Sequence, residues 1–258
     1  MQKKFQLYAF VVFSLFLYFS NAHAFADQPC LHICTVASNR TQGLQQLLNS
    51  CDYQNVQIDV LGMDKPFRGL SDKLIYVLEY IQNLPDSDIV MFVDAYDVLF
   101  MTDADTILSN FLEMGHPFII SGERYCWPLE HRRSEFPPIP TSFKYVNSGV
   151  YMGYVDVMKF IFNSFVPIDP LVNDQDTMTA YYLDNPGQIL IDANCVLFLS
   201  MAGVYKSELI IDYLNKQVTL KETGTRPCTI HGNGCSRAIY QSIYDELFKA
   251  LYQGKGLP

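Results

Sequence analysis

Two aspartates that follow an apolar run are the residues of this sequence whose types and spacing could do chemistry. The segment IVMFVDAYDVLF (89–100) predicts a buried strand that ends in Asp94 and Asp97, with Tyr96 between them. One buried carboxylate is costly and two close together repel each other, so we expect a positive group beside the pair.

Three interpretations of the pair are open. The first is a turn or a helix cap, because aspartate is common at strand ends and N-caps. The second is a phosphatase nucleophile pair, although that chemistry usually has an Asp-x-Asp spacing with a following Gly-Thr, which this segment lacks. The third is a metal–diphosphate site, since a hard divalent cation takes oxygen ligands from carboxylates and from phosphate. In that case Tyr96 could stack on a base.

The segments that must position the pair alternate between strand and helix. We expect strands at 31–38, 56–63 and 89–93, and helices at 41–51 and 70–84, with Ser71 as the N-cap of the second helix. This alternation predicts a parallel sheet with helices on both faces. Ligands bind beyond the carboxyl ends of the strands in such sheets, and the two aspartates lie at such an end.

The second half of the chain predicts further elements. We expect a long surface loop at 121–140, a strand–turn–helix passage at 145–161, an acidic helix start at 172–184, a strand pair or bent strand at 188–199, a short strand with a Gly-rich turn at 228–235 and a final helix at 236–252. Gly149 and Gly153 indicate close backbone approach within the passage at 145–161.

The first 24 residues predict a secretory signal peptide, with Lys3 and Lys4 before an apolar run and Ala22-His23-Ala24 as the cleavage pattern. The run is short for a membrane span, so we expect no stable membrane association after cleavage. The product would be secreted, periplasmic or in the ER lumen. Residues 25–258, with no repeats or obvious linker, predict one domain.

The composition argues against a disordered or fibrous protein. The chain has 258 residues, of which 49% are hydrophobic and 17% charged, which is typical of a globular protein with a sizeable core. Cleavage removes two lysines and no acids, so the net charge changes from −9 to −11. An acidic protein of this kind is not expected to bind nucleic acid. Its seven cysteines, in an exported chain, predict some disulfides, and their spacing does not match a zinc motif.

Seven motifs in order carry a resemblance to a known family. FVDAYDVLF is similar to the metal motif of the glycosyltransferase domain of procollagen lysyl hydroxylases, which is related to collagen galactosyltransferases. The other six are TVAS (35–38), LGM (61–63), YCWP (125–128), NSGVYMGY (147–154), DQ (174–175) and IHGNG (230–234). Together they span nearly the whole chain after the signal peptide.

The resemblance implies a GT-A fold, a Rossmann-like mixed sheet that binds a UDP-sugar through Mn²⁺. It implies Asp94, Asp97 and His231 as metal ligands, a set that Mn²⁺ accepts. The residues that it places at the nucleotide and diphosphate are Tyr96 (stacked on uracil), Val36, Ser38, Lys73, Gly232, Asn233, Gly234 and Arg237. Arg237 stands where the family pattern has a lysine, and the two cations differ in geometry.

The resemblance also implies residues at the sugar and the acceptor. Asp174 would act as a base or stabilise positive charge at the anomeric carbon, with Asp176 as a second choice. Trp127 would hold the sugar, and Asn147 would bind a sugar hydroxyl. The family often carries a run of aspartates before Asp174, where this chain has Asn173.

The implied function is Mn²⁺-dependent transfer of a hexose, galactose or glucose, from a UDP-sugar. The implied acceptor is hydroxylysine or galactosyl-hydroxylysine in collagen-like chains. Asn173 keeps a second interpretation open, a non-catalytic module that binds a nucleotide-sugar or glycan. A metal phosphohydrolase acting on nucleotide diphosphates is a third.

Overall fold

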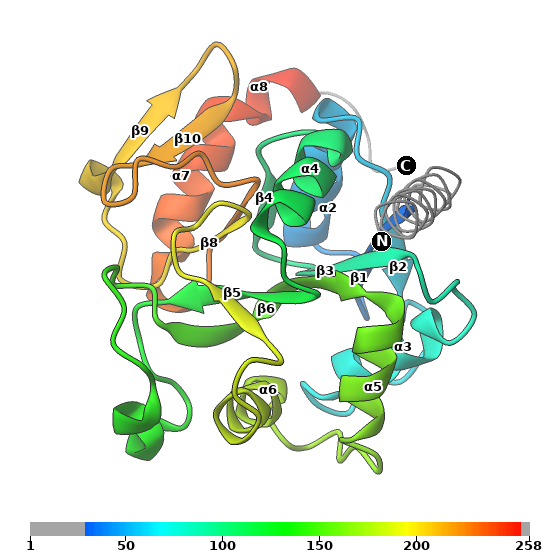
Figure 1. The fold of residues 1–258 in the computed structure, drawn as a ribbon. Helices are drawn as coiled ribbons and strands as arrows, with labels where there is room; N and C mark the ends of the chain where they lie inside the picture. The colour runs from blue at the N-terminus through cyan, green and yellow to red at the C-terminus, as the bar shows by residue number, and fades with distance from the viewer. Residues whose placement is uncertain (1–28, 254–258) are drawn as a thin grey trace, which may run out of the picture. The chain divides into compact units, whose positions relative to one another are not determined.

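The computed structural model describes residues 29–253, and the described residues from Leu31 onward form one compact unit. The expected signal peptide lies outside the described residues. Figure 1 shows a central sheet between two layers of helices. Within residues 29–253, no helix combines the length and the apolar character that crossing a bilayer requires.

A six-stranded mixed sheet forms the centre of the unit. Its order is β2 (Asp59–Leu61), β1 (Leu31–Val36), β3 (Ile89–Asp94), β6 (Tyr145–Tyr154), β5 (Phe118–Glu123) and β7 (Leu190–Asp192). β2, β1 and β3 are parallel, β6 is antiparallel to both of its neighbours, and β5 and β7 are parallel. The predicted fold class, a GT-A-type Rossmann-like mixed sheet with helices on both faces, is confirmed.

Alternate residues of β3 point into different cores. Val90 and Phe92 pack with α3 (Asp72–Ile81) and α5 (Val155–Asn163), whereas Met91 and Val93 pack with α2 (Gln42–Tyr53) and α4 (Ala104–Met114). Figure 1 shows these helix pairs on opposite faces of the sheet. A strand that is buried on both faces reads as a continuous apolar run, as β3 does.

A smaller three-stranded sheet and a hairpin complete the unit. The sheet has the order β4 (Val98–Phe100), β11 (Thr229–His231) and β8 (Phe198–Ser200), and β9 (Leu209–Asp212) pairs with β10 (Gln217–Leu220). The remaining elements are α6 (Asp174–Asp184), α7 (Arg237–Leu247), α8 (Lys249–Tyr252) and three 3₁₀ turns, η2 (Glu130–Glu135), η3 (Lys206–Glu208) and η4 (Gly234–Ser236).

The structure corrects several details of the sequence analysis. Ser71 is the N-cap residue of α3, as expected, but its side chain makes no capping bond and its hydroxyl donates to the Val172 carbonyl. Asp97 caps no helix, since the chain continues into β4. The expected loop at 121–140 begins with the end of β5 and contains η2. The sequence patterns also did not predict β4, β5, α4, β9 or β10.

Six of the cysteines do not form the expected disulfides. Cys34, Cys51, Cys126, Cys195, Cys228 and Cys235 are free, and all but Cys235 are buried. The buried five are divided among three apolar clusters, so they pack as small apolar side chains. Burial raises the pKa of the Cys228 thiol to about 12, which makes it a poor nucleophile.

Candidate active site

The pairing of β11 with β4 brings residues far apart in the sequence together. His231 is in register with Val98, and the Gly232 N–H donates to the Asp97 carbonyl at 2.7 Å. Asp94 is the last residue of β3, three positions before Asp97. The histidine at the end of the small sheet therefore lies beside the aspartates at the end of the large one.

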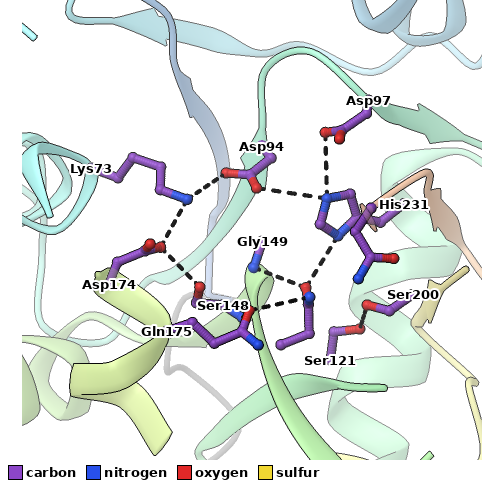
Figure 2. Close-up of polar contacts among 12 residues, drawn as sticks. Lys73, Asp94, Asp97, Ser121, Ser148, Gly149, Asp174, Gln175, Ser200 and His231 are labelled. Atoms are coloured by element: carbon purple, nitrogen blue, oxygen red, sulfur yellow. Dashed lines mark hydrogen bonds and ion pairs between the residues drawn. The ribbon is translucent and has the colours of Figure 1, made fainter. Parts of the chain in front are cut away.

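Asp94, Asp97 and His231 form a cluster that can hold a divalent cation. His231 Nε2 lies 3.6 Å from Asp94 Oδ2 and 3.4 Å from Asp97 Oδ1, and one ligand atom from each residue falls within 4.8 Å of the others. Figure 2 shows the three side chains pointing toward one another. Two carboxylates and an imidazole are a donor set that suits Mn²⁺, so the residues fit the implied metal.

Lys73 supplies the positive group that the aspartate pair requires. Its Nζ lies 3.0 Å from Asp94 Oδ1 and 2.8 Å from Asp174 Oδ2, so it bridges the end of β3 and the first turn of α6 (Figure 2). Burial lowers the pKa of Lys73, but the two carboxylates outweigh it and raise the pKa above its usual value. Lys73 is therefore a buried ammonium held by carboxylates on both sides.

The two aspartates have opposite pKa shifts. Burial raises the pKa of Asp94, and its ion pairs with Lys73 and His231 only partly offset this. Burial also acts to raise the pKa of Asp97, but His231 and Arg237 outweigh it and lower the pKa below its usual value. Burial lowers the pKa of His231, and the two aspartates more than compensate. Close opposite charges thus favour the ionised form of Asp97.

The cluster opens on two cavities. The first, of about 550 Å³, is lined by most of the expected site residues, namely Lys73, Asp94, Asp97, Trp127, Asn147, Asp174, His231, Asn233 and Gly234. The second, of about 400 Å³, is lined by Tyr96, Asp97 and Arg237 with residues of the first turn of α2. Asp97 faces both cavities, which places the metal cluster between them.

Four of the expected site residues line neither cavity. Val36 is buried in the core, and Ser38 donates its backbone N–H to the Tyr96 hydroxyl at 3.0 Å. Gly232 packs against Tyr240, where a Cβ atom would approach within 2.5 Å. Asp176 is half-buried and its Oδ1 has no hydrogen-bond partner. Val36, Ser38 and Gly232 thus support the walls, and Asp176 is less well placed than Asp174.

Asp174 and Asn173 share the start of α6. The Asn173 side chain is the N-cap, accepting from the Gln175 N–H at 2.9 Å. Asp174 is buried and accepts from the Ser148 hydroxyl at 2.9 Å through the same Oδ2 that contacts Lys73. The expected family aspartate is thus replaced by a residue that caps the helix equally well.

Glu123 is a cavity residue that the sequence analysis missed. It is only 4% exposed, and it ends β5 at the same sheet edge at which Asp94 ends β3. Burial raises its pKa to about 7, although Gln175 and Asn233 donate hydrogen bonds to it. A carboxylate after the apolar run 118–120 is the available signal, but the loop expected at 121–140 includes Glu123.

The chain is similar over most of its length to a family model and to several known proteins. A family model described as the PLOD GT domain matches residues 27–255. A multifunctional procollagen lysine hydroxylase and glycosyltransferase of Caenorhabditis elegans is 29% identical over 243 residues, which cover 84% of this chain and 32% of that protein. The human protein LH3, of the same description, is 26% identical over 221 residues, covering 79% and 30%.

The chain spans about a third of the length of these relatives. Among solved structures, a glycosyltransferase involved in the glycosylation of the major capsid of PBCV-1 is 10% identical, with a TM-score of 0.47 and coverage of 83% of this chain and all of the other.

Proposed function

The chain belongs to the PLOD glycosyltransferase-domain family, and on this premise we propose that it transfers a hexosyl group from a UDP-hexose with Mn²⁺ as cofactor. The observation that carries the proposal is the convergence of Asp94, Asp97 and His231 between two cavities. We expect the nucleotide in the cavity of Tyr96 and Arg237, and the sugar in the cavity of Trp127 and Asp174.

The chain's own residues can hold and orient the donor. Asp94, Asp97 and His231 would hold Mn²⁺, which when bound offsets the negative charge that grows on the leaving UDP. Arg237, whose guanidinium lies 3.8 Å from Asp97 Oδ2, supplies a cation at the wall of the second cavity. The exposed Trp127 face offers an apolar surface to the C–H groups of a sugar.

The carboxylate of Asp174 is held in one orientation, which suits a role at the reacting centre. Lys73 and Ser148 both contact its Oδ2, which fixes the orientation of the carboxylate on the cavity wall. Among the described residues, no hydrogen bond is made to Oδ1. This oxygen can accept the proton of an acceptor hydroxyl or stabilise positive charge at the anomeric carbon.

We propose hydroxylysine or galactosyl-hydroxylysine of collagen-like chains as the acceptor, and galactose or glucose as the hexose. The support is the description of the relatives as procollagen lysine hydroxylases and glycosyltransferases. We also propose export of the protein, on the basis of the signal peptide expected at residues 1–24.

Release of UDP from UDP-galactose and UDP-glucose, with and without Mn²⁺, tests the function. We expect Mn²⁺-dependent release, and a loss of about 100-fold or more in Asp94→Ala and Asp97→Ala, because each removes a metal ligand. Asp105→Ala on the exposed first turn of α4 is the matched control and should keep its activity. A wild-type protein that neither binds UDP nor releases it from any UDP-hexose contradicts the proposal.

A non-catalytic binding module is the second candidate, and Asn173 on the cavity wall favours it. Calorimetry distinguishes the two. Binding of UDP with Mn²⁺, but no transfer to peptide or sugar acceptors and no hydrolysis, would support the module.

A further inference from the structure

A hydrogen-bonded chain of amides connects the wall of the sugar cavity to His231. It begins at the Trp127 carbonyl and the Glu123 carboxylate, passes through Gln175 and Asn147, and ends at the imidazole. Gln175, Asn147 and His231 are each 5% exposed or less. Because these groups have little access to water, we take the direction of each bond from its protein partners.

The orientation of the Gln175 amide is fixed from both ends. Its Nε2 lies 2.6 Å from the Trp127 carbonyl oxygen and 2.6 Å from Glu123 Oε1, and a carbonyl oxygen can only accept. Its Oε1 lies 3.4 Å from the backbone nitrogen of Ser148, which can only donate. If the amide were flipped, its oxygen would face the Trp127 carbonyl and the Glu123 carboxylate, and its NH₂ would face the Ser148 N–H.

The orientation of Asn147 follows from Gln175 and from a strand irregularity. Pairing of β5 with β6 shifts register between Ile120 and Ser121, which leaves the Gly149 N–H free to donate to Asn147 Oδ1 at 3.0 Å. Asn147 Nδ2 donates to Gln175 Oε1 at 3.3 Å. Bulges of this kind redirect side chains next to active sites. Asn147 Oδ1 is therefore the atom that faces His231.

We propose that Asn147, held by Gln175, is a positioning residue that fixes the tautomer of His231. His231 Nδ1 lies 3.1 Å from Asn147 Oδ1, an acceptor, so Nδ1 carries the proton. When a cation is held by Asp94 and Asp97, the lone pair is then on Nε2, the nitrogen that faces these two carboxylates. The inference rests on the proposed metal site.

This role differs from the sugar contact that the sequence predicted for Asn147. Both polar ends of its side chain are committed, Oδ1 to Gly149 and His231 and Nδ2 to Gln175. Partners behind a metal-ligating histidine orient the ring and raise its basicity, and their loss typically costs 10–100-fold in metal affinity.

The test compares Asn147→Leu, which keeps the size but removes the acceptor, with Asn147→Asp, which keeps an acceptor at Oδ1. Two-dimensional ¹⁵N NMR of the protein saturated with diamagnetic Zn²⁺, which would occupy Nε2, reports whether the Nδ1 proton of His231 is held in a hydrogen bond. We expect a protected Nδ1–H signal in the wild type and in Asn147→Asp, and loss of this signal in Asn147→Leu. Mn²⁺ titration followed by EPR should show about 10–100-fold weaker binding in Asn147→Leu.

Asn49→Leu is the matched control, because Asn49 is also buried and hydrogen-bonded, to the Tyr244 hydroxyl at 2.7 Å, but it lines neither site cavity. It should leave the Nδ1–H signal and Mn²⁺ binding unchanged. If Asn147→Leu does not fold, Gln175→Leu, which frees the Asn147 amide to flip, replaces it with the same expected direction.

The experiment distinguishes a failure of the proposed function from a failure of the positioning role. A wild-type protein that binds no Mn²⁺ contradicts the proposed function. Mn²⁺ binding by the wild type, together with an unchanged Nδ1–H signal and affinity in the position-147 and position-175 variants, overturns the positioning role alone.

Discussion

At the scale of single residues, Glu123 shows how burial sets the charge of a carboxyl group. It lies at the end of β5 with 4% exposure, and burial raises its pKa from 4.5 to about 7. Below the unfolded value, Glu123 is protonated in both states, and folding has no charge to bury. Between pH 4.5 and about pH 7, the unfolded chain has released this proton while the folded state keeps it. Glu123 therefore makes the protein less stable as pH rises through this range, and its effect is constant above it.

Replacing Glu123 tests this pH dependence. In Glu123→Gln the group cannot ionise, so the variant should lose less stability than the wild type between about pH 5 and pH 8, by roughly 1–3 kcal/mol. Urea unfolding at both pH values gives the two differences. In the variant, the NH₂ of the new amide faces a donor of Gln175 or Asn233, which destabilises the fold equally at both pH values. Comparing the change in stability with pH between the two proteins removes this constant cost. Equal pH dependence in the two proteins would show that Glu123 does not titrate in this range.

At the scale of elements, β6 is the strand on which the site depends most directly. It carries Asn147, Ser148 and Gly149, where its pairing with β5 is interrupted. A Cβ atom at Gly149 would lie 2.1 Å from His231 Cε1 and 2.8 Å from Asp94 Oδ2. The absence of a side chain at this position is what lets the histidine and the aspartate meet across the strand.

Two glycine substitutions on β6 distinguish an effect on Mn²⁺ binding from an effect on the stability of the fold. Gly149→Ala should displace His231 or Asp94 and weaken Mn²⁺ binding by about 10-fold or more, as EPR titration measures. Gly153→Ala, where a Cβ would lie 2.8 Å from Phe118 Cδ2, should cost about 1–3 kcal/mol of stability and leave Mn²⁺ affinity nearly unchanged. Equal Mn²⁺ affinity in both variants would mean that the site tolerates the extra methyl group.

At the scale of the whole described unit, the candidate metal site joins two sheets. Asp94 belongs to the six-stranded sheet, whereas His231 belongs to the three-stranded sheet, and Asp97 lies on the connection between them. A cation bound by all three residues would bind the folded chain and not the unfolded one. Such binding stabilises the folded state by mass action.

Thermal unfolding with increasing Mn²⁺ tests this linkage. We expect the melting temperature to rise, with a gain of about 2.7 kcal/mol when the free metal is 100 times its dissociation constant. Asp97→Asn should abolish most of the gain, and EDTA should reverse it. Asp105→Asn is the control and should keep it. A melting temperature that does not respond to Mn²⁺ would contradict the three-ligand site.

Strong local patterns made much of the fold predictable. The continuous apolar run of β3 and the helical spacing of α3 identified both elements, and the alternation of elements predicted the parallel part of the sheet. The signals for α4 were also present. Asp103 caps it through the Thr106 N–H, and Gly115 ends it with a φ of 64°. The hairpin β9–β10 was missed because its strands have only four residues each.

The sequence by itself determined the strand–helix order and the polar residues at the strand ends, because both depend on contacts between near neighbours in the chain. Only the tertiary structure decided that Lys73 bridges Asp94 and Asp174, that Glu123 is buried, and that Asn147 faces His231. These contacts join residues 21 to 101 positions apart, and they depend on how helices pack on the large sheet and how the two sheets meet. Periodicity along the chain carries no information about such packing.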